Sequence, residues 1–586
     1  MELLELVQAQ KNLPSYSLYS TTNLDDVRDS ILSSKDNFVA VDTETTGLDW
    51  TIDRAFGVSL AWDDYGIFIR NTDFGADNIG RLMNALFSST EKTFVFHNAE
   101  FDLHMMKVTY GTNFPISLLD TMRLSYVDNP SSKHGLKELG EIVFGAAAGA
   151  AEDVIKEYIH KYRLKGYHQV PSEFMDPYAV LDTVLTKALA HIYMDVPRSS
   201  EERQITKIEH DLIPVIFKME DIGIRINTEY VNKMIKEYRV EQRAIQDKLY
   251  QIVGFPLEVN SNQQLASYLY DMLKIKPSKL TETGQRSVDS KTLEKIKHPV
   301  GTPVVELVLR NRNLAKWSST FLEPYKDVQG RIHPHWNAMG AGTGRFSSSS
   351  PNMQNVPKTL RRTFIPDNEF FDFDYSQIEL RIAASLSNQR NMVQAFKDGE
   401  DLHATTASLV FQKELNEVTK EDRRIGKTLN FATLYGAGVG KLSGDLELSK
   451  SQAGVLLNHL HTAYPQLKAQ IYYCKLAAKR DGYIETAFKR KLPIEAGKEF
   501  KAFNYMIQGT AADLMKLTLL RTAEYVESVG GTITNCVHDE IVFDNLEETA
   551  ITDLRQIMEN FTLRGDVPVV VDFQRSKISW GDLIDG

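Results

Sequence analysis

In the first third of the chain, short apolar segments alternate with segments whose apolar residues recur at helical spacing. Apolar and β-branched residues predict strands at residues 37–41, 55–62, 66–70 and 93–97. Apolar residues at helical intervals predict helices over about residues 99–107 and 176–193. Strands that alternate with helices are typical of an α/β domain, which we place at residues 22–195.

The pattern changes after residue 200. From 200 to 325 apolar residues recur at helical spacing, as in Leu265-Ala-Ser-Tyr-Leu-Tyr-Asp-Met-Leu, and strand character is lost. Strand patterns return near residues 331–336, 369–374, 533–537 and 540–543, with helices between them. We therefore predict a second, larger α+β domain over residues 200–586.

Four carboxylates and a phenol follow the predicted elements of the first domain. Asp42 and Glu44 are two positions apart, so on a strand both point to one face. Asp102 opens the helix after the fourth strand, and Tyr178 precedes Asp182 by one helical turn. Together these side chains suit two Mg²⁺ ions, which prefer oxygen ligands. An isolated Asp-x-Glu pair is more often part of a surface turn, so the prediction depends on the whole set.

A second pair of carboxylates lies in the larger domain. Asp374 ends an alternating strand, at the point where the chain turns into a helix. Asp539 lies at the tip of a predicted hairpin that follows two glycines. The hairpin would bring Asp539 to the edge of the first strand, although an isolated hairpin aspartate is more often structural. Two such carboxylates can share a pair of divalent ions, which suggests nucleotidyl transfer.

A basic and aromatic helix is predicted between these two acids. Arg423, Lys427, Phe431 and Tyr435 are four positions apart and drift by about 40° per step, so they form one winding stripe. Two cations followed by two aromatic rings match a triphosphate followed by a sugar and base. A core helix with salt-bridged cations is the alternative for the helix considered alone.

Charge and cysteine content narrow the class of protein. The net charge of −11 would argue against nucleic acid, but Lys274 to Lys326 contains eleven Lys/Arg and five Asp/Glu, a local charge of +6. Only two cysteines are present, too few for a disulfide framework, so we expect an intracellular, cytoplasmic protein. We find no apolar run of the roughly 18–20 residues that a bilayer requires, and expect no membrane.

The carboxylates of both predicted domains resemble those of known families. The first set, in its order and context, resembles the DEDDy 3′→5′ exonucleases, whose proofreading domains have a ribonuclease-H-like fold. The segments around Asp374, Arg423 and Asp539 resemble motifs A, B and C of the family A DNA polymerases, over residues 200–586. The implied fold is an α/β ribonuclease-H-like exonuclease domain followed by an α+β right-hand polymerase domain. Its parts would be a thumb at about 205–330, a palm at about 331–395 and 500–586, and fingers at about 396–499.

This resemblance implies roles for individual residues. In the exonuclease, Asp42, Glu44, Asp102 and Asp182 would be metal ligands and Tyr178 would orient water. In the polymerase, Asp374 and Asp539 would bind both metals, with Glu540 beside them. The nucleotide-binding residues would be Arg423, Lys427, Phe431, Tyr435, Glu379 and His403. Glu379 would exclude a 2′-hydroxyl, and phenylalanine at position 431 implies rejection of dideoxynucleotides.

Other segments resemble the DNA-binding parts of the family. They are Thr343-Gly-Arg345-Phe-Ser-Ser, the run from Pro351 to Pro357, the run from Asn504 to Asp513, and the thumb-like run from Leu309 to Lys316. The DNA-binding residues would be Arg345, Asn504, Gln508, Lys316 and His538. One departure is Phe500, which stands where the family often has an arginine.

The resemblance also implies partners and cofactors. We expect primer–template DNA, deoxynucleoside triphosphates, and two Mg²⁺ ions at each site, with Mn²⁺ as a substitute. A helicase or single-strand-binding protein is a further expected partner of a monomer, whereas the short thumb argues against thioredoxin. The chain begins almost directly with the exonuclease segment, which favours a phage or organellar replicative enzyme, although a processed fragment would look the same. Alternatives are a repair or gap-filling polymerase, a nuclease whose second domain only binds nucleic acid, and a non-catalytic replication scaffold.

Overall fold

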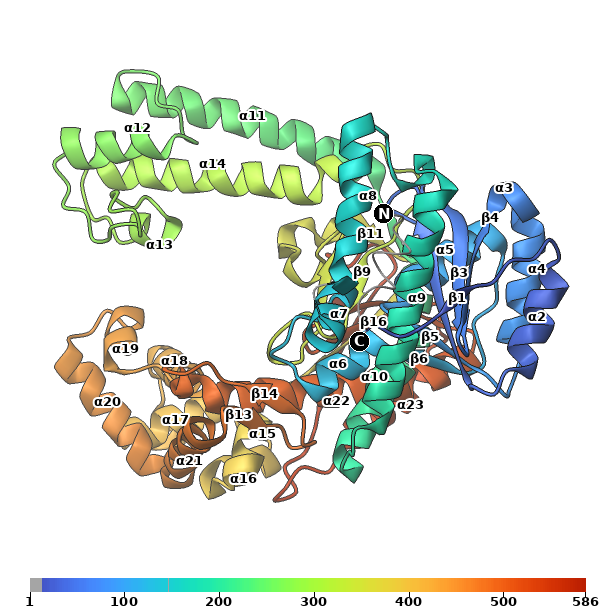
Figure 1. Cartoon of the computed structure of the whole chain (residues 1–586). Helices are drawn as coiled ribbons and strands as arrows, with labels where there is room; N and C mark the ends of the chain where they lie inside the picture. Colours follow the sequence, from blue (N-terminus) through green and yellow to red (C-terminus); the bar gives the residue numbers. More distant parts are fainter. Residues whose placement is uncertain (1–12, 146, 586) are drawn as a thin grey trace.

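One long helix lies between two sheets. The computed structural model describes residues 13–145 and 147–585 (Figure 1). Helix α10 (Ser200–Ile222) begins with a capping box formed by Ser199 and Glu202. It packs against α5 (Ala99–Tyr110), α6 (Thr121–Asp128) and β6 (Leu118–Asp120) of the first sheet's domain and against α22 (Ala502–Ser528) and β15 (Thr532–Val537) of the second. The predicted order of an α/β domain followed by an α+β domain is confirmed.

The first sheet has six strands in the order β1-β4-β3-β2-β5-β6. Its strands are β1 (Ser17–Leu18), β2 (Phe38–Thr45), β3 (Ala55–Trp62), β4 (Tyr65–Arg70), β5 (Thr93–Phe96) and β6 (Leu118–Asp120). Strand β2 pairs antiparallel with β3 and parallel with β5, which places it inside the sheet. The four predicted strands are present, but β2 continues past Glu44 and therefore carries both acids within the strand.

Helices cover both faces of this sheet. They are α2 (Leu24–Ser33), α3 (Asn71–Phe74), α4 (Ala76–Phe87), α5 (Ala99–Tyr110), α6 (Thr121–Asp128), α7 (Leu136–Phe144), α8 (Ala147–Tyr162) and α9 (Ser172–Asp195). Val39 and Val41 pack with α2, α4 and α5, whereas Ala40 packs with α8 and α9. Since Asp42 and Glu44 continue the even positions of β2, strand alternation points them toward α9.

The second sheet has five antiparallel strands in the order β15-β16-β12-β17-β18. They are β12 (Phe370–Tyr375), β15 (Thr532–Val537), β16 (Glu540–Asp544), β17 (Val571–Ser576) and β18 (Ile584–Asp585). The predicted hairpin is β15–β16, and it lies directly beside β12. Helices α22 (Ala502–Ser528) and α23 (Ala550–Glu559) pack against each other near this sheet.

Two groups of helices extend from this second sheet (Figure 1). An arm, drawn in green, contains α11 (Thr228–Val253), α12 (Asn262–Ala266), α13 (Ser290–Leu293) and α14 (Gly301–Phe321), and α11 lies along α14. The other group contains α15 (Ile378–Ser387), α16 (Arg390–Lys397), α17 (Leu402–Phe411), α18 (Lys420–Leu434), α19 (Val439–Asp445), α20 (Lys450–Ala463) and α21 (Pro465–Asp481). The predicted helical character of 200–325 is confirmed apart from the short strand β7 (Ile224–Ile226).

Small sheets connect these parts. Strand β7 pairs with β8 (Arg331–Ile332) and β11 (Phe364–Ile365), while β9 (His335–Asn337) pairs with β10 (Ser347–Ser349) and β13 (Tyr483–Glu485) with β14 (Lys491–Pro493). Within residues 13–145 and 147–585, no helix is both long enough and apolar enough to cross a membrane.

A buried ionic cluster joins the two halves at α10. The Glu209 carboxylate lies 2.6 Å from Lys516 Nζ, 2.6 Å from Arg490 Nη2 and 3.7 Å from Arg123 Nη1. Burial alone would raise the pKa of Glu209, but these cations lower it to about 2. Arg490 also contacts Asp513 on α22 at 2.6 Å. Removing one member would leave an unpaired buried charge, which lowers the free energy of unfolding by about 3–5 kcal/mol. The cluster therefore holds the first domain against the second.

Candidate active sites

Three carboxylates meet above the sheet of the first domain. Asp42 and Glu44 point from β2 toward α9, and Asp182 points back from that helix. One oxygen from each lies within 4.8 Å of the others. The sequence prediction that these acids share a site is therefore consistent with the fold, and strand alternation together with helix packing explains it.

Asp102 reaches the same strand from the opposite face of the sheet. Its Oδ1 accepts hydrogen bonds from the backbone N–H of Thr43 at 2.9 Å and from the Thr43 hydroxyl at 2.7 Å. Thr43 lies between Asp42 and Glu44, so these bonds fix Asp102 beside the other acids. The role of Thr43 was not visible in the sequence, because a threonine between two acids carries no signal of its own.

The carboxylates of this site are buried close to one another. Burial raises the pKa values of Asp42 and Glu44 well above the usual range, and the neighbouring carboxylates raise them further. Burial likewise raises the pKa of Asp102 to about 7. Buried, mutually repelling carboxylate oxygens are the donor set of a hard divalent cation, so this site fits a metal ion.

Lys137 on α7 supplies a cation that the sequence analysis missed. Its ammonium forms an ion pair with Asp182 and lies 4.7 Å from the centre of the Tyr178 ring. It is mostly buried. A lysine on an amphipathic helix is usually a solvated residue, so only the fold reveals that this one enters the acidic site. In this arrangement Lys137 balances part of the charge that a metal ion would otherwise balance.

Replacing Lys137 with methionine is expected to tighten metal binding at this site by about tenfold. The methionine retains the apolar stem but removes the competing charge, and ~1.4 kcal/mol corresponds to tenfold in affinity. Isothermal titration with Mn²⁺ measures the change. Lys133→Met is the matched control, because Lys133 is close in sequence but 79% exposed. Unchanged or weaker binding in the Lys137 variant would contradict this role.

Tyr178 lies one helical turn before Asp182 on α9 and is buried. Burial and then the charge of Asp182 raise the pKa of its phenol far above the usual range. The phenol therefore keeps its proton and acts as a hydrogen-bond donor or acceptor rather than as a base.

The second pair of acids meets at the edge between β12 and β16. Asp374 lies directly opposite Glu540 in the strand register, and the backbone N–H of Tyr375 donates to the carbonyl of Asp539 at 3.0 Å. His538 adopts a positive φ of 54° and makes the hairpin turn that presents Asp539. Asp374 is exposed to solvent, but partial desolvation by the surrounding protein, and then the charges of Asp539 and Glu540, raise its pKa to about 7. Burial also raises the pKa of Asp539, so these oxygens also fit a divalent cation.

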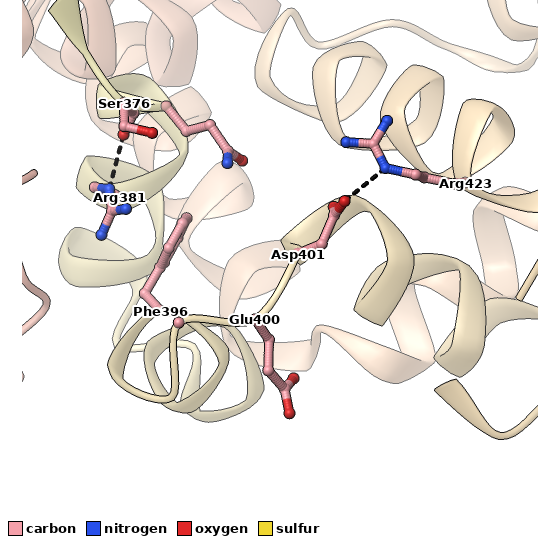
Figure 2. Close-up of a pocket in the computed structure, with 8 residues that line it drawn as sticks. Ser376, Arg381, Phe396, Glu400, Asp401 and Arg423 are labelled. Carbon is pink, nitrogen blue, oxygen red and sulfur yellow. Dashed lines mark hydrogen bonds and ion pairs between the residues drawn. The ribbon is translucent and has the colours of Figure 1, made fainter. Parts of the chain in front are cut away.

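Helix α18 places Arg423 near the end of β12. Thr419 and Asp422 form the predicted capping box at its start. Arg423 Nε lies 2.6 Å from Asp401 Oδ2, and Figure 2 shows these two side chains facing each other. They line a pocket of about 280 Å³ together with Ser376, Gln377, Arg381, Phe396, Gly399 and Glu400. The pocket therefore connects the end of β12 to Arg423.

The rest of the predicted stripe is only partly helical. Lys427 is exposed and Phe431 is half-buried. Tyr435 lies just beyond the helix, which ends at Leu434 because Gly436 takes a positive φ of 62°. Tyr435 is the C-cap residue: its N–H still donates to the carbonyl of Phe431 at 3.0 Å, so it follows Phe431 by one helical turn, and it is 42% exposed. His403 is buried on α17, where it contacts Asn430 of α18 at 3.1 Å and its ring centre lies 5.9 Å from that of Phe431, so it lies beside the stripe.

Polar groups from three segments gather near Tyr435. Arg345 forms an ion pair with Glu379 in the first turn of α15. Gln508 on α22 lies close enough to Tyr435 to lower the pKa of its phenol, against the larger effect of burial. Among the described residues, Asn504 Nδ2 is buried without a hydrogen-bond partner. A buried donor without a partner costs free energy, so Asn504 is suited to an acceptor that a ligand supplies.

Three further residues of interest are exposed. Lys316 is exposed on α14 of the arm, and His538 is exposed at the hairpin tip. Phe500, the departure noted in the sequence, is 48% exposed just before α22.

Comparisons with known proteins agree with the division of the chain into two domains. Residues 228–582 match the family model described as DNA polymerase family A, and residues 19–195 match the model described as 3′-5′ exonuclease. The chain is 30% identical to DNA polymerase I of Synechocystis sp., covering 92% of this chain and 59% of that protein. It is 31% identical to DNA polymerase I of Chloroflexus aurantiacus, covering 91% and 60%.

A solved structure shares the fold. It is the POL domain of Pol1 from M. smegmatis in complex with DNA primer-template and dNTP. The TM-score is 0.83 at 23% identity, over 97% of this chain and 100% of that one. The chain spans about 60% of the length of the two curated relatives named above.

Proposed function

The chain belongs to DNA polymerase family A, and on that premise we propose that it extends a DNA primer along a template and removes nucleotides from the same 3′ end. The observation that carries the proposal is the Asp374–Asp539 edge, which lies beside a pocket lined by Arg423. A separate acidic site around Asp42 accounts for the second activity. We assign the exonuclease domain to residues 22–195 and the polymerase domain to 200–586, with the thumb, palm and fingers at the bounds expected above.

In the polymerase site, each residue has a proposed task. Asp374 and Asp539 would hold divalent ions, for which we propose Mg²⁺ with Mn²⁺ as a substitute. When bound, such ions supply positive charge to the primer 3′ oxygen and the phosphates. Arg423 and Lys427 would neutralise the triphosphate. Arg423 contacts Asp401 through Nε at 2.6 Å, which leaves its Nη donors for the phosphates.

The sugar and base would lie further along α18. Phe431 and Tyr435 offer ring faces to them, and His403 would reach the phosphates from α17. Glu379, held by Arg345, would close the space that a 2′-hydroxyl needs.

The DNA duplex would be read by shape. Arg345, Asn504 and Gln508 would contact minor-groove acceptors, which are nearly the same for every correct base pair. Lys316 on the arm would contact the phosphate backbone, and His538 the primer terminus. The unpartnered Asn504 donor supports this assignment.

In the exonuclease site, Asp42, Glu44, Asp102 and Asp182 would hold the metal ions. The protonated Tyr178 phenol would orient the attacking water, and Thr43 would keep Asp102 in place. Lys137 would move from Asp182 toward the phosphate when the ions bind.

Primer extension by the purified chain tests the proposal. A labelled primer with a mismatched 3′ nucleotide should be trimmed and then extended when Mg²⁺ and all four deoxynucleotides are present. Removal of metal with EDTA should stop both reactions, and added Mg²⁺ should restore them. Extension without any trimming would remove the exonuclease assignment, and trimming without extension would leave a nuclease. A role in replication rather than repair, and a helicase or single-strand-binding partner, remain part of this proposal.

A further inference from the structure

Trp580 lies in the segment between β17 and β18. It is 3% exposed. Its backbone N–H donates to the carbonyl of Phe364 at 3.0 Å, and the two rings are 5.9 Å apart in an edge-on contact. The segment after β17 is therefore anchored to β11 of the small sheet.

The indole of Trp580 points at an acidic residue of the polymerase edge. Its Nε1–H donates to Glu540 Oε1 at 2.7 Å and lies 3.2 Å from Asp372 Oδ2. An indole has one N–H, so the shorter contact to Glu540 is the main bond. Asp372, on the same face of β12 as Asp374, is a weaker second acceptor.

Arg361 completes the contact from the other side. Its guanidinium lies 3.7 Å above the centre of the Trp580 ring. It donates two hydrogen bonds to the Glu540 carboxylate, at 3.0 and 3.2 Å. Charge-assisted and bidentate bonds are the strong ones, and stacking on an indole holds the guanidinium plane. Both oxygens of Glu540 are thus occupied by donors from outside the strand pair.

The restraint on the Glu540 carboxylate is important because of where Glu540 lies. It follows Asp539 in the hairpin and lies opposite Asp374 in the register. Without Arg361 and Trp580, the Glu540 carboxylate is free to rotate among Asp374 and Asp539, where it competes for the same cation or repels its neighbours. Fixing Glu540 therefore also fixes the backbone that presents Asp539.

We infer that Trp580 and Arg361 are positioning residues of the polymerase centre: they hold Glu540 in one orientation and so set the geometry of Asp539 opposite Asp374. This inference rests on the proposed polymerase function. Neither residue needs to touch DNA or nucleotide. The alternative is that Trp580 is only a core residue, in which case its N–H has no effect on chemistry.

Trp580→Phe separates these two possibilities. Phenylalanine keeps an aromatic ring against Phe364 and Arg361 but removes the N–H. We expect kcat for nucleotide addition to fall about 10- to 100-fold, as for loss of one hydrogen bond to a charged group. KM for the deoxynucleotide should change by less than about twofold, since the residue does not contact substrate. Degradation of single-stranded DNA by the same protein should be unchanged.

The chain offers a matched control. Trp336 is also fully buried, at 1% exposure, but among the described residues its Nε1 has no hydrogen-bond partner. Trp336→Phe should therefore leave both activities unchanged. Arg361→Lys provides a second test, because it keeps the charge but loses the bidentate geometry, and should lower kcat in the same way.

Metal binding gives a readout that does not depend on activity. In an Asp42→Ala background, which disables the first site, Mn²⁺ titration should show several-fold weaker binding in Trp580→Phe than with tryptophan. Wild-type kcat in Trp580→Phe, or equal loss of extension and degradation with a lowered melting temperature, would overturn the inference. If the parent chain does not extend primers at all, it is the proposed function that fails, whereas unchanged Mn²⁺ affinity speaks against the positioning role alone.

Discussion

Replacing Asp374 or Asp539 with alanine is expected to abolish primer extension, by about a thousandfold or more, and to leave degradation of single-stranded DNA intact. The loss follows from removing one of the two carboxylates that would hold charge at the primer 3′ oxygen, an effect of several kcal/mol, with ~1.4 kcal/mol for each tenfold. Both activities are measured on the same preparation, so intact degradation shows that the variant is folded.

Asp572→Asn is the matched control for Asp374. Asp572 lies opposite Asp374 on the other neighbouring strand, β17, and its charge also contributes to the raised pKa of Asp374. It is exposed and belongs to neither the hairpin nor the pocket. We expect extension within a fewfold of the parent chain. Synthesis at nearly the parent rate in Asp374→Ala would refute the assignment of the site.

Asp42→Ala is expected to give the reverse result. Removal of a 3′ nucleotide should fall by about a thousandfold, because one of three convergent ligands is lost, and primer extension should continue. The clearest measurement uses a primer with a mismatched 3′ end, on which the variant should stall or extend without correction. The remaining acids cannot replace Asp42, since strand alternation allows only Glu44 beside it on the same face of β2.

Glu152→Gln controls for charge near this site. Glu152 on α8 is close enough to raise the pKa of Glu44, but it pairs with Lys156 at 2.9 Å and lies outside the set of three convergent oxygens. Its substitution should leave trimming unchanged. Equal losses in Glu152→Gln and Asp42→Ala would mean that general acidity, and not a metal site, explains the first result.

Local periodicity was enough to predict much of both sites. The alternation of a strand puts Asp42 and Glu44 on one face, and one helical turn puts Tyr178 beside Asp182. The hairpin around Asp539 follows from paired glycines and alternating residues. These relations involve residues close together in the sequence, where backbone geometry alone decides direction.

Contacts between residues far apart in the sequence could not be predicted from local periodicity. Lys137 reaches Asp182 from another helix, and Trp580 reaches Glu540 across 40 positions. Strand β17 was also missed: Val571 and Phe573 face inward, but the intervening polar residues resemble a surface segment. Packing partners, rather than local pattern, decide each of these.

Helix α10 has a mechanical consequence for the two proposed activities. Its Glu209 is paired with cations from both sides, so bending at this point would expose buried charge. On the proposed function, we therefore expect the two sites to keep a fixed separation. We therefore expect the primer 3′ end, and not the protein domains, to move. It must separate from the template and reach the first acidic site, so the stability of the last base pairs would set the rate of correction.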